Sequence, residues 1–278
     1  MQLAPPTLHP IRIDSPLILS VPHSGRVVGK DLARLANGGA PALLGLSDPH
    51  VDELVRSLVE RGHGAVVAQA PRAAIDVNRA AHERDPDVHE GAPPAPPSSR
   101  ARLGLGLTIA RTAPGRPLWK RKIDDSVFAQ WMRSAWDPYH ASLSELVEEA
   151  LARFGTCLLL DCHSMPPLAR GEPRIVLGDR HGATAAPWVS AVAAGACHDR
   201  GFEPAFNTPY AGGEIVRAHA APARGIHALQ VEIDRSLYLD RTLRVAGPGM
   251  GRGRALMETI AAKLDVAARA EGFRIAAE

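Results

Sequence analysis

At 278 residues, with 45% hydrophobic and 22% charged residues, the chain has the composition of a folded globular protein of one large domain or two small ones. A formal net charge of +2, with no basic run rich in aromatic residues, excludes a nucleic-acid-binding protein. The N-terminus has no signal-peptide pattern, no apolar run is long enough to span a bilayer, and the three cysteines form no C-x-x-C pair. We therefore expect a cytoplasmic enzyme or binding protein without a membrane partner.

The predicted elements alternate strands with helices. Strands are predicted over 16–25, 64–70, 156–164, 174–179 and 226–235, with another within 72–80. Helices are predicted over 48–62, with Asp48 as N-cap and Gly62 at the end, over 127–155 with a kink near Pro138, over 184–198 and over 251–271. Strands of Val, Ile and Leu between helices predict one α/β domain over 1–278, with a mostly parallel mixed sheet, helices on both faces and a Pro-rich loop at 91–101.

Polar side chains gather where the predicted strands end, as in "SVPHSG" and "LLDCHS". Open α/β sheets bind their ligands at that edge. His23 and His163 each end an apolar strand and Asp48 begins a helix, so together they form a His₂-carboxylate set of the kind that holds catalytic Zn²⁺. Asp161 or Asp52 would orient the histidines. Each residue taken alone also fits a hydrogen-bonded surface histidine or a plain N-cap.

Further candidates surround this set. Glu232 lies in an apolar strand, where it either pairs with Arg235 or acts as a general base. Arg72 and Arg79 either bind a substrate carboxylate or pair with nearby acidic residues. "NTPYAGGEI", with Tyr210 and Gly212, suits a backbone that approaches a ligand closely, or a tight turn. Ser164 lacks a G-x-S-x-G context and Cys162 reads as a small buried residue, so neither is predicted to be a nucleophile.

Several segments, in order along nearly the whole chain, resemble the N-formylglutamate amidohydrolase family. They are "SVPHSGR" at 20–26, "SDPHVDEL" at 47–54, "PRAAIDVNR" at 71–79, "GLGLTIARTAPGRPLW" at 104–119, "WDPYHASL" at 136–143, "LLDCHSMP", "VLGDRHG", "NTPYAGG" and "IHALQVEIDRSLYLD". The resemblance implies a phosphorylase/hydrolase-like fold related to the zinc carboxypeptidases and to the aspartoacylase/succinylglutamate desuccinylase group.

The resemblance also implies roles for individual residues. His23, Asp48 and His163 would hold Zn²⁺ or another divalent metal, Glu232 would activate the metal-bound water, and Arg72 would stabilise the carbonyl oxygen. Asn78 and Arg79 would hold the substrate carboxylate, with Tyr210, Gly212 and Arg235 also at the substrate. The relatives use a compact H-x-x-E, whereas His23 and Asp48 are 25 residues apart. Asp52 and Glu53 therefore remain alternatives to Asp48.

The function implied is metal-dependent hydrolysis of the linear C–N amide of N-formyl-L-glutamate to formate and glutamate, a last step of histidine breakdown. One alternative is an amidohydrolase for another N-acyl or N-formyl amino acid, and another is a non-catalytic binding protein on the same fold. "LGDRHG" also occurs in metallophosphoesterases, but the further D-x-H and G-N-H-[DE] motifs of those enzymes are missing. Asp179 and His181 are better interpreted as a supporting pair or as part of a loop on the substrate side.

Overall fold

The structure, a computed structural model, describes residues 1–96, 99–112 and 115–277, with side chains as far as 272. The chain forms two compact units, and it passes between them several times. The helix–loop unit comprises Met1–Thr7, Pro22–Ser47 and Val67–Ala141, and the sheet unit comprises Leu8–Val21, Asp48–Val66 and Ser142–Glu278. Each unit is described by itself, and the single domain expected over 1–278 stays a prediction.

A seven-stranded mixed sheet forms the centre of the sheet unit, in the order β1-β3-β2-β4-β7-β5-β6. Strands β2, β4 and β7 are parallel neighbours, whereas β5 runs antiparallel to β7 and parallel to β6. The bounds are β1 Thr7–His9, β2 Leu17–Val21, β3 Gly64–Val67, β4 Cys157–Met165, β5 Ile175–Gly178, β6 Pro204–Phe206 and β7 Ile226–Asp234. The five longer strands lie within or close to their predicted ranges, and the short β1 and β6 were not predicted.

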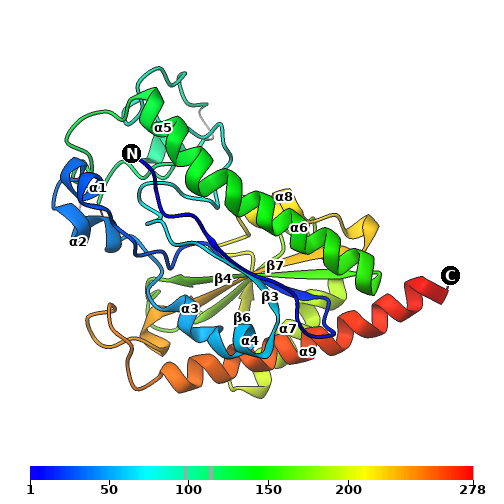
Figure 1. Cartoon of the computed structure of the whole chain (residues 1–278). Helices are drawn as coiled ribbons and strands as arrows, with labels where there is room; N and C mark the ends of the chain where they lie inside the picture. Colours follow the sequence, from blue (N-terminus) through cyan, green and yellow to red (C-terminus); the bar gives the residue numbers. More distant parts are fainter. Residues whose placement is uncertain (97–98, 113–114, 278) are drawn as a thin grey trace. The chain divides into compact units, whose positions relative to one another are not determined.

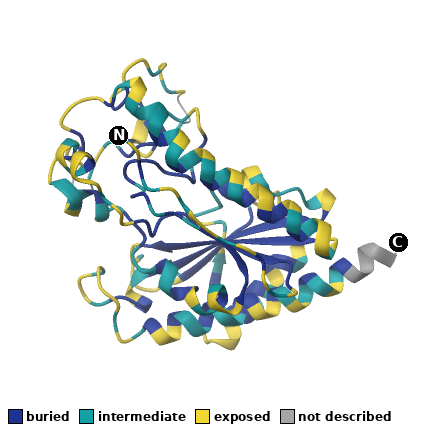
Figure 2. Cartoon of the chain, viewed as in Figure 1, coloured by how far each residue is buried: buried dark blue, intermediate teal, exposed yellow. Residues whose placement is uncertain are grey.

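Helices cover both faces of this sheet, as the sequence predicts (Figure 1). On one face lie α6 (Asp137–Phe154) and α8 (Glu214–His219), and on the other lie α3 (Val51–Leu54), α4 (Arg56–Arg61), α7 (Pro187–Asp199) and α9 (Met250–Ala277). All residues of β2, β4 and β7 are buried, which the dark sheet in Figure 2 makes plain. Burial on both faces explains the apolar runs of β2 and of the first half of β4, and it requires internal partners for the polar residues of β7. No helix in the described part of the chain has the length and apolarity that crossing a membrane requires.

The long helix expected over 127–155 is interrupted where its proline predicts. It begins as α5 (Asp125–Trp131), widens into the π-helical η2 (Met132–Trp136) and continues as α6. Pro138, in the first turn of α6, has no N–H for the carbonyl four residues earlier, and its ring crowds that carbonyl. A π-helical turn relieves such crowding without ending the helix.

Two local predictions are wrong. Residues 72–80 form turns rather than a strand, because the Asp76 carboxylate accepts the Asn78 N–H at 2.9 Å and thereby holds the backbone in a tight turn. Asp48 is not an N-cap: α3 begins at Val51 after His50, which has a left-handed φ of 60°. The helix expected over 48–62 is thus split into α3 and α4, although Gly62 ends it as predicted.

The helix–loop unit has an apolar core of its own. Trp119 and Trp131 lie in this core with their ring centroids 5.7 Å apart, and three short helices contribute residues to it. These helices are α1 (Lys30–Leu35), α2 (Gly39–Leu44) and α5, and the 3₁₀ helix η1 (Arg100–Leu103) belongs to the same unit. The Pro-rich segment at 91–101 has no strand or α-helix in its described residues and ends in η1, while 97 and 98 lie outside the described residues.

Candidate active site

Two strand ends of the sheet unit bring four polar side chains together. In the register of the parallel pair β4–β7, Asp161 lies opposite Gln230 and His163 lies opposite Glu232. Residues two apart in a strand face the same side, and parallel strands carry their carboxyl ends to the same edge. All four side chains are buried. The polar residues Asp161 and His163 of "LLDCHS" therefore belong to a buried polar cluster.

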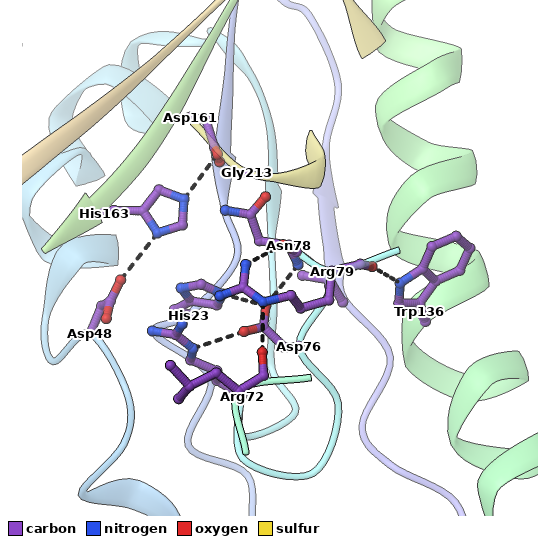
Figure 3. A network of polar contacts seen from close by, with 12 residues as sticks. His23, Asp48, Arg72, Asp76, Asn78, Arg79, Trp136, Asp161, His163 and Gly213 are labelled. Atoms are coloured by element: carbon purple, nitrogen blue, oxygen red, sulfur yellow. Dashed lines mark hydrogen bonds and ion pairs between the residues drawn. The ribbon is translucent and has the colours of Figure 1, made fainter. Parts of the chain in front are cut away.

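The ring of His163 is held between two carboxylates (Figure 3). Its Nε2 lies 2.9 Å from Asp161 Oδ2, and its Nδ1 lies 3.2 Å from Asp48 Oδ2. Burial acts to lower the pKa of His163, but the charges and hydrogen bonds of Asp161, Asp48 and Glu232 outweigh it and hold this pKa well above its usual value. Without a metal, the imidazole therefore carries a proton on both nitrogens at neutral pH.

Asp48 receives donors from two further residues of the sheet unit. Its Oδ2 accepts the Ser164 N–H at 3.2 Å, and its Oδ1 accepts Nη2 of Arg235 at 2.9 Å. This buried carboxylate is engaged by tertiary partners, which is why it does not cap the helix. Glu53, the alternative ligand, accepts instead from His50 at 2.7 Å and from Arg254 at 3.4 Å. Of the alternatives, Asp48 is thus the carboxylate that the structure brings to His163, while Asp52 lies on α3 beside Glu53.

Glu232 has a partner that the sequence did not suggest. Its Oε1 accepts Nε2 of Gln230 at 3.0 Å, and Oε1 of Gln230 accepts the Gly213 N–H at 3.0 Å. Arg235, considered as the partner of Glu232, forms an ion pair with Asp48. The alternation of Gln230 and Glu232 along one strand was the available signal, because two polar residues on the same face of an interior strand require each other or a third partner.

In the helix–loop unit, Asp76 connects three of the remaining candidates (Figure 3). Oδ1 of this buried carboxylate accepts Nε2 of His23 at 2.8 Å and the Asn78 N–H at 2.9 Å, and its Oδ2 accepts Nε of Arg72 at 3.0 Å. Burial would raise the pKa of Asp76, but the charges of His23 and Arg72 outweigh burial and hold it well below its usual value. An ionised Asp76 therefore orients both a histidine and an arginine.

Arg79 is held by backbone groups of the same unit. Its Nε donates to the Leu105 carbonyl at 2.9 Å and its Nη1 donates to the Asn78 carbonyl at 2.8 Å. Its own carbonyl accepts Nε1 of Trp136 at 3.0 Å, as Figure 3 shows. Burial lowers the pKa of the guanidinium, although the group stays charged at neutral pH. The geometry places Asn78 and Arg79 beside Asp76, and their binding of a substrate carboxylate stays a prediction.

Residues 207–213, with Tyr210 and Gly212, form a loop that lies tightly against β5. A Cβ at Gly178 would stand 2.8 Å from the Ala211 carbonyl carbon and 2.9 Å from the Tyr210 oxygen, so only glycine permits this approach. Gly212 has a φ of 115°, which also favours glycine. The contact of this loop with a substrate stays a prediction.

Asp179 and His181 support the 207–213 loop. Asp179 accepts Ser190 Oγ at 2.6 Å and Nδ2 of Asn207 at 2.9 Å, and the His181 N–H donates to Asn207 Oδ1 at 3.1 Å. "LGDRHG" is thus a loop anchor in this structure.

Neither of the two remaining polar residues of "DCHS" has the surroundings of a nucleophile. Cys162 is buried, and burial raises the pKa of its thiol well above the usual value, so its thiolate does not form at neutral pH. The Ser164 hydroxyl accepts Nε of Arg235 at 3.2 Å. All three cysteines are free and buried.

Within the described residues, one group of His, Cys, Asp or Glu side chains can hold a metal ion: the buried His23, Asp48 and His163. In each histidine, Nε2 faces a buried carboxylate, Asp76 for His23 and Asp161 for His163. Such pairs are the usual support of metal-binding histidines, because the carboxylate fixes the proton on one nitrogen and leaves the other for the metal. The donor set therefore suits a divalent transition metal.

Comparisons with known proteins identify related chains over most of the length. The family model of N-formylglutamate amidohydrolase matches residues 15–239. The N-formylglutamate deformylase of Pseudomonas putida is 30% identical over 235 residues, which cover 82% of this chain and 83% of that protein. The Pseudomonas aeruginosa deformylase is 28% identical over 233 residues, or 81% and 82% of the two chains.

A solved structure supports the same relation. The crystal structure of N-formylglutamate amidohydrolase from Ralstonia eutropha JMP134 is similar to this chain with a TM-score of 0.86 and 31% identity, and the match covers 95% of this chain and 98% of that one. A protein of Agrobacterium tumefaciens matches with a TM-score of 0.70 at 17% identity over 95% of both chains, which shows a shared fold alone.

Proposed function

Because the chain belongs to the N-formylglutamate amidohydrolase family, we propose that it hydrolyses the formyl amide of N-formyl-L-glutamate to formate and glutamate. The match over residues 15–239 carries this proposal, since it contains all the candidate site residues, from His23 to Arg235. The relatives are deformylases, so the chain is a hydrolase that acts on an amide bond of a small molecule.

His23, Asp48 and His163 are proposed to hold one Zn²⁺ or a similar divalent ion. The covalent path of the chain supports the inclusion of His23, which follows the last residue of β2 by two positions, while β2 pairs in parallel with β4, the strand of His163. The carboxylates behind both histidines leave Nδ1 of each ring as the ligand atom. When bound, such an ion supplies a Lewis acid and lowers the pKa of a water molecule toward neutrality.

Glu232 is proposed as the general base and acid. Its place beside His163 on the neighbouring strand suits a carboxylate that takes a proton from the attacking water and returns it to the leaving amine of glutamate. Arg72, oriented by Asp76, would stabilise the negative charge that develops on the formyl oxygen. Asn78 and Arg79 would bind a carboxylate of the substrate. Asp76 positions Asn78, and the Asn78 carbonyl positions Arg79.

The remaining candidates have supporting contacts of different kinds. Tyr210 and Gly212 would contact the substrate from a loop whose backbone is fixed against Gly178. Arg235, predicted at the substrate, holds Asp48 at 2.9 Å, so any contact with a substrate would add to this ion pair. We expect the chain to act in the cytoplasm, where its three free thiols stay reduced.

Formate release from N-formyl-L-glutamate by purified protein tests the proposal. The assay compares chelator-treated protein with and without added Zn²⁺, and it includes His163→Ala and Glu232→Gln. His198→Ala is the matched control, because His198 is an exposed histidine of α7 that pairs with Glu203. We expect Zn²⁺-dependent release by the wild type and the control, and a loss of release in the two site variants.

Other outcomes favour the alternatives. N-acetyl-L-glutamate and N-formyl-L-aspartate belong in the same assay, and faster hydrolysis of either would favour an amidohydrolase for another N-acyl or N-formyl amino acid. If the protein binds one Zn²⁺ per chain but hydrolyses none of these amides, the proposed metal site is supported and the proposed substrate is refuted. A protein that binds no metal and hydrolyses none of these amides would favour the alternative of a non-catalytic binding protein.

A further inference from the structure

Gln230 is a buried amide in the interior of β7 that uses both of its polar atoms. The side chain is 4% exposed. Its Nε2 donates to Oε1 of Glu232, and its Oε1 accepts the Gly213 N–H, each at 3.0 Å. One side chain therefore connects the proposed general base to the end of the 207–213 loop. All of these residues belong to the sheet unit.

The identity of the donors fixes how the amide is oriented. A backbone N–H can only donate, so the Gln230 oxygen must face Gly213 and its NH₂ must face Glu232. The NH₂ then holds one oxygen of the Glu232 carboxylate as an acceptor. Rotation of the Glu232 carboxylate would leave a buried N–H donor of Gln230 without this acceptor, a change that costs free energy.

The loop held by Gly213 has its other attachments on and after β5. The Arg180 N–H donates to the Ala211 carbonyl at 2.7 Å, and Nη1 of Arg180 donates to the Gly212 carbonyl at 3.3 Å. These contacts fix the loop from the side of β5, whereas Gln230 fixes it from β7. A loop held at both sides keeps its backbone in one place next to the strand that carries Glu232.

We propose that Gln230 is a positioning residue that ties the Glu232 carboxylate to the 207–213 loop, so that the base and the loop are oriented together. The inference rests on the proposed function, because it takes Glu232 as the base and the loop as a substrate contact. The Gln230 side chain makes the two contacts that define this role, one with Glu232 and one with the Gly213 N–H. Its effect passes through Glu232 on one side and through Gly213 on the other.

Two substitutions separate the two contacts. Gln230→Met has a similar length and no hydrogen-bonding group of comparable strength, so it removes both contacts. Gln230→Glu keeps an acceptor for the Gly213 N–H but places a second carboxylate against Glu232, so it preserves the contact with the loop and disturbs the base. Gln130→Met, on α5 of the other unit, is the matched control.

The measurements are kcat and KM for N-formyl-L-glutamate, bound Zn²⁺, and hydrogen exchange of the backbone amides in peptides spanning 207–219. We expect kcat to fall about 10- to 100-fold in both variants, the range typical of a misplaced catalytic group. Exchange in 207–219 should quicken and KM should rise in Gln230→Met alone. Zn²⁺ content should match the wild type in both variants and in the control.

The outcomes distinguish this inference from the proposed function. An active wild type whose kcat and loop exchange are unchanged in Gln230→Met would overturn the inference. Faster loop exchange with an unchanged kcat would also overturn it, because Gln230 would then stabilise the loop without positioning the base. A wild type inactive on all tested amides would refute the proposed function, and loop exchange in the two variants would still test the contact with Gly213.

Discussion

Replacement of Asp161 by Asn is expected to weaken Zn²⁺ binding about 10- to 100-fold, or roughly 1.4 to 2.8 kcal/mol. Asp161 is completely buried, and its two oxygens accept from Ser20 Oγ at 2.7 Å and from His163 Nε2 at 2.9 Å. Asparagine has nearly the same size, but it is neutral and offers one acceptor and one donor group. An amide NH₂ facing His163 would move the ring proton to Nδ1 and so block the proposed ligand atom.

The same substitution should change the number of protons released by metal binding. The carboxylates around His163 hold its pKa well above the usual value against the effect of burial, so the metal-free ring is protonated at pH 7. A metal on Nδ1 displaces that proton, and the affinity of the wild type should therefore fall as the pH falls. Asp161→Asn lowers the pKa of His163, so we expect fewer protons to be released at pH 7.

Competition with a chromophoric chelator gives the Zn²⁺ affinity, and calorimetry in two buffers of different ionisation enthalpy gives the proton count. Asp234→Asn is a matched control, because Asp234 is a buried aspartate of β7 that accepts from Ser236 N–H and Oγ. The control should bind Zn²⁺ like the wild type. An Asp161→Asn protein with the affinity and proton release of the wild type would refute the role assigned to Asp161.

Two further predictions concern stability. Burial is the main cause that lowers the pKa of His89 to about 4, and this ring lies edge-on against Phe128, so only the unfolded chain takes up this proton between about pH 6.5 and 4. The free energy of unfolding should thus fall by about 2 kcal/mol from pH 7 to 5 because of His89. Urea titrations of His89→Phe at the two pH values should not show this contribution. A pH dependence identical to that of the wild type would contradict the reasoning. Gly178→Ala should lower the free energy of unfolding by about 1–3 kcal/mol, because the new Cβ would clash with the 207–213 loop. Gly195→Ala is the control and should not destabilise α7, because no atom lies within 4 Å of the new Cβ. Equal urea midpoints for the two variants would contradict the packing argument.

The central strands of this chain could be predicted because strands buried on both faces are rich in apolar residues. The strand β2 and the first half of β4 are mainly apolar runs next to polar residues, whereas polar and apolar residues alternate in β7. The bounds of β4 and β7 were predicted to within one residue, and β2 ends four residues before its predicted end. His23 and His163 stand out for the same reason, as polar residues where apolar runs end. The short edge strands β1 and β6 bury little apolar surface and carried no comparable signal.

The errors arise where side-chain contacts distant in sequence decide the local backbone. Asp48 precedes an amphipathic run and has the ordinary features of an N-cap, yet His163, Ser164 and Arg235 engage its carboxylate instead. The sequence around Asp76 predicts a strand, but the segment forms turns in which Asp76 contacts His23 and Arg72. In both cases a buried carboxylate needs several donors, and the fold supplies them from segments that local propensity cannot see.

Gln230 shows what the alternation of polar and apolar residues in a strand can predict and what it cannot. In "ALQVEID" the polar residues Gln230, Glu232 and Asp234 share one face of β7, and the sequence predicts a partner or a catalytic role for Glu232 but none for Gln230. The strand is buried throughout, so the polar face must be satisfied internally. Gln230 does this with Gly213 and Glu232, and Asp234 does it with Ser236. When the surrounding pattern places a strand in the interior of a sheet, polar residues on one face of that strand therefore predict a functional site. Such buried polar side chains are stable only when they form a hydrogen-bonded network with one another or with other buried groups.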